Sequence, residues 1–163
     1  MKDVRIIVTG GTIDKVHDPR SEGHVFSADG ATQVPEMLTI GRCHFPVVQL
    51  LMLKDSLYFE DADREAIAAA VAEAPEEAIV ITHGTGTMGE TARFLAGSAL
   101  GKTVVLTGGM RPFSLYASDG EFNLGGAVIA AQILRPGVWG TMNGRVFPAE
   151  GLNKNVEQGR FDV

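Results

Sequence analysis

The chain has 163 residues, of which 45% are hydrophobic and 21% charged, and its formal net charge is −6. That length suits one domain with a buried core. The negative charge gives no electrostatic reason to bind nucleic acid or an anionic membrane, so neither is an expected partner.

Cysteine content and hydropathy indicate the cellular compartment in which the protein is expected. The single cysteine, Cys43, rules out an internal disulfide and fits a reducing compartment. No apolar run reaches the ~18 residues of a membrane-spanning helix, and the run before the first glycines is too short for a secretory signal. We therefore expect a cytoplasmic protein.

Three short runs rich in β-branched residues predict strands. They are residues 4–9, 78–82 and 103–107, and each leads into glycine. Continuous apolar runs of this length are typical of strands buried on both faces of a parallel sheet. Residues 46–53 and 138–143 are the candidates for a fourth and a fifth strand.

Helical patterns lie between these strands. They cover residues 61–74, 87–100 and 118–134, and a shorter helix is predicted at about 31–41. Strands that alternate with helices predict a doubly wound α/β fold, with a mainly parallel sheet and helices on both faces. We expect a single domain of this class over residues 1–163.

Two of the predicted helices begin with the spacing of a capping box, Thr87-x-x-Glu90 and Ser118-x-x-Glu121. One long segment, residues 14–30, is polar, rich in turn formers and without clear periodicity, which predicts a loop. A loop of that length inside a compact domain is more often functional than idle.

Hydroxyl side chains follow several of the predicted strands. Thr12 follows the first, Ser56 follows Asp55 after the fourth candidate, and Thr85 follows the run that ends at residue 82. Open α/β sheets bind their ligands at the carboxyl ends of the strands. Nearby glycines let a small ligand approach the backbone, and helix N-termini offer N–H groups to anions. The pattern indicates a site for a small anionic molecule.

Each of these residues also has an ordinary structural explanation. A turn threonine or serine commonly bonds to nearby backbone, and an isolated lysine such as Lys154 is usually a solvated surface charge. Lys154 gains a chemical role only if the fold brings it to Thr85, where a neutral amine could act as a base. The histidines show no zinc spacing, so no metal site is expected.

A dinucleotide site is an alternative from another functional class. Gly84, Gly86 and Gly89 spell G-x-G-x-x-G after a predicted strand and before a predicted helix. The acidic residue expected about 20 positions on should end the next strand, which ends instead in VLTGGM. Gly89 also falls inside the predicted helix. The sequence therefore favours a site without a nucleotide cofactor.

Six stretches together resemble the bacterial-type L-asparaginase family, which includes type I and type II asparaginases and related amidotransferase subunits. They occur in the family's order with suitable spacing over the whole chain. They are TGGTI (9–13), KDS (54–56), THGTGTM-ETA (82–92), VVLTGGMRP (104–112), SDGEFNL (118–124) and NGRVFPAEGLNKN (143–155). The resemblance implies a doubly wound α/β domain that hydrolyses the side-chain amide of L-asparagine to L-aspartate and ammonia, without cofactor or metal.

The resemblance also implies roles for single residues. Thr12 is similar to the family's primary nucleophile. Thr85 and Lys154 are similar to two members of a second catalytic group, in which Thr85 positions or activates the water and stabilises the oxyanion.

A further set of residues is expected to bind substrate. Ser56 resembles the residue that holds the substrate α-carboxylate, and Asp55 precedes it in the same stretch. Gly11, Gly84 and Gly109 would bring the backbone close to the substrate.

Three departures from the family pattern affect the expected function. Gly86 replaces the aspartate that completes the Thr–Lys group and grips the substrate α-amino group. The loss of this aspartate leaves two alternatives open. One is an amidase for another small amide that lacks the α-amino group, and the other is a weakly active or inactive homologue that binds an amino acid.

Residues 14–30 lack the family's loop tyrosine, for which His17 or His24 would have to substitute. The chain ends after the first of the family's two domains, as in short-chain asparaginases, and we expect a homodimer or a higher homo-oligomer.

Overall fold

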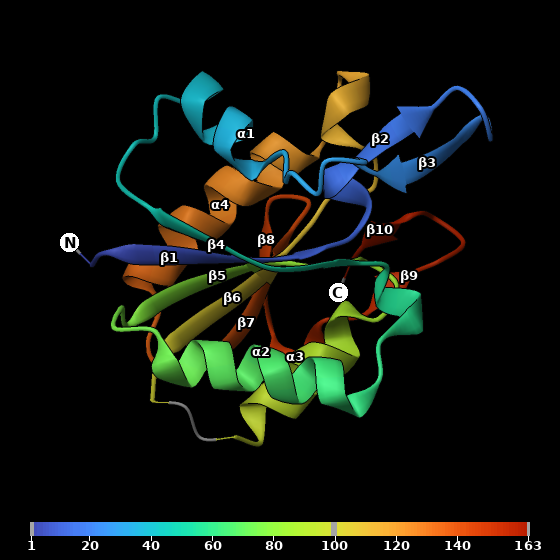
Figure 1. The fold of residues 1–163 in the computed structure, drawn as a ribbon. Coiled ribbons are helices and arrows are strands. Elements are labelled where there is room, and N and C mark those ends of the chain that lie inside the picture. The colour runs from blue at the N-terminus through green and yellow to red at the C-terminus, as the bar shows by residue number, and fades with distance from the viewer. Residues whose placement is uncertain (1, 99–100, 163) are drawn as a thin grey trace.

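A six-stranded sheet forms the centre of the computed structural model, which describes residues 2–98 and 101–162 (Figure 1). The strand order is β4-β1-β5-β6-β7-β8. The first five strands in that order run parallel, and β8 pairs antiparallel with β7. The strands span Val4–Gly10 (β1), Val47–Lys54 (β4), Ala78–Thr82 (β5), Thr103–Thr107 (β6), Gly137–Met142 (β7) and Arg145–Pro148 (β8).

Helices cover both faces of this sheet. In Figure 1, α1 and α4 lie above the sheet, and α2 and α3 lie below it. They span Val34–Ile40 (α1), Asp61–Glu73 (α2), Met88–Ala96 (α3) and Gly120–Ile133 (α4). The predicted doubly wound α/β class is confirmed, and the five predicted strands form within about a residue of their expected ends.

The predicted loop over residues 14–30 is wrong in its central part. Lys15–Asp18 (β2) and Gly23–Phe26 (β3) form an antiparallel hairpin, in which Val16 pairs with Val25. Each strand has four residues, which is too few for an alternating pattern to stand out in the sequence. The hairpin projects from the end of the molecule where the parallel strands end (Figure 1).

The helix predicted over residues 87–100 is shorter than expected. It begins at Met88 and ends at Ala96, where Gly97 takes the C-cap position. Residues 99–100 of the predicted helix lie outside the described residues. Glycine favours helix ends because it pays a large entropic cost inside a helix.

Neither predicted capping box forms. The Thr87 hydroxyl donates to the Ser56 carbonyl at 2.9 Å instead of capping α3. At α4 the N-cap residue is Asp119, one position later than predicted, and the Ser118 hydroxyl donates to the Arg111 carbonyl at 2.7 Å. In both cases the hydroxyl holds a loop against the helix, which a local sequence pattern cannot reveal.

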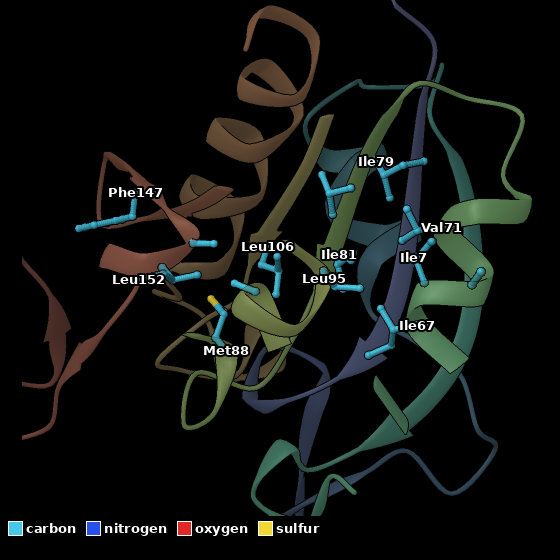
Figure 2. Packing of buried hydrophobic residues seen from close by; sticks show 14 of the residues in the cluster. Ile7, Ile67, Val71, Ile79, Ile81, Met88, Leu95, Leu106, Phe147 and Leu152 are labelled. Carbon is cyan, nitrogen blue, oxygen red and sulfur yellow. The ribbon is translucent and has the colours of Figure 1, made fainter. Parts of the chain in front are cut away.

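The apolar core has two layers, one on each face of the sheet. The β-branched residues of β1, β5 and β6 point alternately to the two faces, so each strand contributes side chains to both layers. Figure 2 shows the layer under α2 and α3. Its labelled members are Ile7, Ile67, Val71, Ile79, Ile81, Met88, Leu95, Leu106, Phe147 and Leu152.

The C-terminal segment packs against the core although most of its residues are polar. Lys154–Asn155 (β9) and Arg160–Phe161 (β10) pair antiparallel, and the Phe161 side chain is buried against Phe147. This pairing fixes the position of Lys154. Among the described residues, no helix has both the length and the apolar character needed to cross a membrane.

Candidate functional site

Three predicted site residues lie at the carboxyl ends of three adjacent strands. Thr12 follows β1, Ser56 follows β4 and Thr85 follows β5. β4 and β5 lie on opposite sides of β1, so the strand order reverses there. Open α/β sheets bind ligands in the crevice at such a reversal. The fold therefore brings the three hydroxyl groups to one end of the sheet.

The turns after β1, β4 and β5 are in direct contact. Gly11 has a φ of +85°, and a Cβ at that position would lie 2.5 Å from the Gly84 amide nitrogen. A Cβ at Gly84 would in turn clash with the Ser56 hydroxyl. Glycine is required at Gly11 by its backbone conformation and at both positions by this close approach. The two glycines thus place the backbone beside Thr12 against the backbone beside Thr85.

Lys154 reaches Thr85 from the other end of the sequence. Its Nζ donates to Thr85 Oγ1 at 3.1 Å, across a separation of 69 residues. Thr85 is buried and Lys154 is partly buried. Leu152, two residues earlier, is buried in the core and anchors the segment that carries the lysine. Because the Thr85 oxygen accepts from the lysine, its own hydroxyl proton can donate elsewhere.

Ser56 has an unsatisfied hydroxyl. The side chain is 1% exposed, and its Oγ has no hydrogen-bond partner among the described residues. A buried polar group left unpaired costs about 1–3 kcal/mol. A hydroxyl in this state, packed against Gly84, fits a contact with a ligand.

Asp55 is already paired. Its Oδ2 lies 2.6 Å from Lys15 Nζ, and its Oδ1 accepts from the Leu57 amide at 3.1 Å. Burial opposes the charge of this carboxyl, but the Lys15 ammonium and the Leu57 N–H together hold its pKa below the usual value. The ion pair ties β2 to the 3-10 helix Ser56–Tyr58, so Asp55 holds the base of the hairpin beside the turn that carries Ser56.

Gly86 lies beside an apolar side chain. A Cβ at this exposed position would lie 2.7 Å from Cδ2 of Leu57, which is 68% exposed. The backbone at Gly86 has an ordinary negative φ, so other residues are sterically allowed if Leu57 moves. The space into which a side chain at this position would extend is therefore occupied by Leu57.

Gly109 packs against the segment that follows Thr12. A Cβ there would lie 3.5 Å from the Ile13 side chain and 3.4 Å from Gly120. The Asp119 carboxylate accepts the next amide, that of Met110, at 2.9 Å. The structure thus places Gly109 against the residue after Thr12, where it packs under the turn.

Asp14 was not singled out by the sequence. Its carboxyl group is fully buried, and Oδ1 accepts from the Thr32 hydroxyl at 2.6 Å and the Gln33 amide at 2.7 Å. Its Oδ2 has no partner among the described residues. Burial raises the pKa of this carboxyl. Asp14 thus joins the two ends of the segment that contains the hairpin, by bonding to Thr32 and Gln33. Because Asp14 lies in a polar stretch of the sequence, nothing there indicated that it would be buried.

His83 is a structural residue. Its ring is fully buried, with Nδ1 2.8 Å from the Gly84 carbonyl oxygen and Nε2 2.9 Å from Thr91 Oγ1. Burial lowers the pKa of the ring to about 4. Within the described ranges, the histidine, cysteine and acidic side chains form no group of three that could hold a metal.

A family model described as asparaginase, N-terminal, matches residues 3–161. The chain belongs to the asparaginase family. It is 30% identical to a glutaminase-asparaginase of Acinetobacter glutaminasificans, over 94% of this chain and 50% of the relative. It is 32% identical to a probable periplasmic L-asparaginase of Haemophilus influenzae, over 94% of this chain and 46% of the relative.

A solved structure confirms the family's fold. L-asparaginase I of Vibrio cholerae superposes with a TM-score of 0.78 at 27% identity, over 92% of this chain and 47% of that structure. The chain of this asparaginase-family member thus spans about half the length of the relatives it matches.

Proposed function

We propose that this asparaginase-family protein is an amidohydrolase that converts L-asparagine to L-aspartate and ammonia, with Thr12 as its nucleophile. The single observation that carries the proposal is the Lys154–Thr85 hydrogen bond of 3.1 Å, beside the turn that carries Thr12. The contact joins residues 69 positions apart, next to the close approach of Gly11 and Gly84. Family membership supports the same reaction class.

The proposed reaction has two steps. The Thr12 oxygen forms a bond to the amide carbon, the C–N bond breaks, and the hydroxyl proton leaves with the nitrogen as ammonia. Water then cleaves the ester, which releases aspartate and restores the Thr12 hydroxyl. The Thr85 proton, left free by the Lys154 contact, donates to the water or to the developing oxyanion.

Substrate binding is proposed to use the unsatisfied hydroxyl of Ser56. That hydroxyl donates to the substrate α-carboxylate, which removes the cost of leaving it unpaired. Gly11 and Gly84 leave no side chain between their turns, so the turns that carry Thr12 and Thr85 lie close to this hydroxyl. Neither the attack by Thr12 nor the hydrolysis of the ester requires a metal or an organic cofactor.

The test is ammonia release from L-asparagine by the purified protein. Thr12→Ala is expected to lower kcat by at least ~100-fold, because the attacking oxygen is lost. Thr39→Ala is the matched control, since the Thr39 hydroxyl makes a local contact with the Pro35 carbonyl on α1. An active Thr12→Ala protein would refute the nucleophile, and a wild-type protein that releases no ammonia would refute the substrate.

A second candidate function is an amidase for a small carboxylate amide without an α-amino group. Gly86 supplies no carboxylate, Leu57 occupies the adjoining space, and Asp55 is neutralised by Lys15. These observations favour a substrate that carries no ammonium group. Succinamic acid, the des-amino analogue of asparagine, separates the two candidates when its kcat/KM is compared with that of L-asparagine. If the protein binds these amides but releases ammonia from neither, it is a binding protein and not an amidase.

Location, domain extent and assembly stay predictions. The single cysteine fits the cytoplasm, whereas one matched relative is named as periplasmic. Residues 1–163 are proposed to form one asparaginase N-terminal-type domain. A homodimer or higher homo-oligomer is also proposed.

A further inference from the structure

Leu57 is an exposed apolar side chain beside the candidate site. It directly follows Ser56 in the 3-10 helix Ser56–Tyr58, and it is 68% exposed. It is not among the described residues that form the two core layers. Ligand sites are lined mainly by apolar side chains, with a few polar groups that orient the ligand. Leu57 is therefore available to contact a ligand that the Ser56 hydroxyl orients.

The Leu57 side chain and the Ser56 hydroxyl border the same small space. A Cβ at Gly86 would lie 2.7 Å from Leu57 Cδ2 and 3.9 Å from Ser56 Oγ. Apart from the neighbouring residues in the chain, Leu57 and Ser56 supply the nearest described atoms to that point. Gly86 is itself exposed, so a ligand can reach this space from solvent. A molecule bonded to the Ser56 hydroxyl has the Leu57 side chain as its neighbour.

The turn that carries Leu57 is held in place by two hydrogen bonds. The Asp55 carboxylate accepts from the Leu57 amide at 3.1 Å. The Ser56 carbonyl accepts from the Thr87 hydroxyl at 2.9 Å, and Thr87 directly follows Gly86. These bonds keep Leu57 beside Gly86 before a ligand binds, so the contact with a ligand requires little additional ordering of the protein.

The charges around Leu57 do not favour a cationic group on the ligand. Both oxygens of the Asp55 carboxylate already have partners, Lys15 at 2.6 Å and the Leu57 amide. The Asp14 carboxyl is fully buried, whereas the space beside Leu57 is open. An ammonium group placed against Leu57 would lose water and gain no opposite charge. A methyl group in the same place would leave water and gain an apolar contact.

We propose that Leu57 is a specificity-determining residue and that it selects a substrate with a short alkyl group on the carbon that carries the carboxylate. The substrate class is the half-amide of a 2-alkyl dicarboxylic acid, in which the alkyl group stands where L-asparagine has its amine. The inference rests on the proposed function in one respect, namely that Ser56 binds the substrate carboxylate. It goes further by assigning a favourable contact to the group that replaces the amine.

The test compares the binding of three dicarboxylates that release no ammonia: L-aspartate, succinate and the enantiomer of 2-methylsuccinate that matches L-aspartate. Methyl and ammonium groups are nearly equal in size, so the first and third ligands differ mainly in charge. Titration calorimetry is expected to give a Kd for 2-methylsuccinate ~4-fold below that for succinate, as for one buried methyl group. The same Kd should be at least ~10-fold below that for L-aspartate, whose ammonium is left unpaired.

Variants of Leu57 test whether this side chain is the cause. Leu57→Ala removes the contact, so succinate and 2-methylsuccinate are expected to bind equally. Leu57→Asn keeps the branched shape but offers an amide oxygen to an ammonium, so it is expected to reverse the preference in favour of L-aspartate. Because Leu57 is exposed and outside the core layers, neither variant removes core packing.

Two further variants serve as controls. Leu50→Ala is the matched control, because Leu50 is 46% exposed on the edge strand β4, and its preference among the three ligands should equal that of the wild type. Ser56→Ala is expected to weaken the binding of all three dicarboxylates by ~10-fold, because each loses the hydrogen bond to its carboxylate. The ratio between succinate and 2-methylsuccinate should stay the same in Ser56→Ala.

The outcomes separate this inference from the proposed reaction. A wild-type protein that binds L-aspartate more tightly than 2-methylsuccinate would overturn the role of Leu57, even if it releases ammonia from L-asparagine. A preference for 2-methylsuccinate that Leu57→Ala leaves intact would overturn it as well. A preference that Leu57→Ala abolishes would support the inference, and ammonia release from the half-amide of 2-methylsuccinate would then show whether the site is also catalytic. A wild-type protein that binds none of the three would overturn both.

Discussion

Gly86 is the residue on which substrate choice is expected to depend. Gly86→Asp is predicted to raise kcat/KM for L-asparagine by ~10–100-fold, because a charge-assisted hydrogen bond to the substrate ammonium contributes about 1.5–3 kcal/mol. The same change is expected to give no gain on succinamic acid, which has no ammonium group. Steady-state ammonia release with both amides measures the difference.

Gly86→Ala is the control for that substitution. It displaces the Leu57 side chain in the same way, because both variants carry a Cβ at the position that lies 2.7 Å from Leu57 Cδ2. It adds no charge, so it is expected to leave the preference between the two amides unchanged. An equal gain in both variants would mean that the position of Leu57, and not a missing carboxylate, limits the reaction.

His83 is expected to make the stability of the fold depend on pH. Its pKa is about 4 in the folded protein against an ordinary value of 6.5, so the unfolded chain binds the additional proton between those values. The free energy of unfolding should therefore be highest above pH ~6.5 and fall towards pH 4, by up to about 1.4 kcal/mol per pH unit.

Urea unfolding between pH 4 and 7 checks this dependence. His83→Gln retains hydrogen-bonding groups but does not titrate, so its stability should vary less over that range. His17→Gln is the comparison, because the His17 side chain is exposed on the hairpin. If His83→Gln lost stability with pH as steeply as the wild type, other groups would be responsible.

At the scale of elements, the parallel strands were predictable because each is a continuous apolar run. β1, β5 and β6 are buried on both faces, and such a run needs no partner to be recognised. The β2–β3 hairpin was missed since its strands are short and largely polar. The predicted capping boxes failed because the hydroxyls of Thr87 and Ser118 serve contacts with other loops.

The common location of the candidate site residues was predictable to the same extent as the strand ends that carry them. Thr12, Ser56 and Thr85 follow apolar runs, so their common location follows from a parallel sheet. The Lys15–Asp55 pair spans 40 residues, and the Asp14 contact with Thr32 spans 18. Contacts of this kind depend on where the hairpin lies relative to the ends of the strands, which no local spacing records.

At the scale of the whole molecule, the two core layers bury β1, β5 and β6 within the single chain. Helix α4 is different, because Phe122, Ile129 and Ile133 are 67%, 57% and 75% exposed in the single chain. If a second copy covers them, folding and association are linked. The stability of the protein then depends on its concentration.

The thermal midpoint is therefore predicted to rise with protein concentration. For a dimer that separates on unfolding, each tenfold increase contributes about 0.7 kcal/mol per chain, which raises the midpoint of a domain of this size by ~2 °C. Calorimetry over a hundredfold range of concentration measures the slope. Ile129→Lys is expected to have a lower midpoint that does not change with concentration. A wild-type midpoint that is equally constant would show that the folded chain gains nothing from a second copy, and the exposed apolar side chains of α4 would need another explanation.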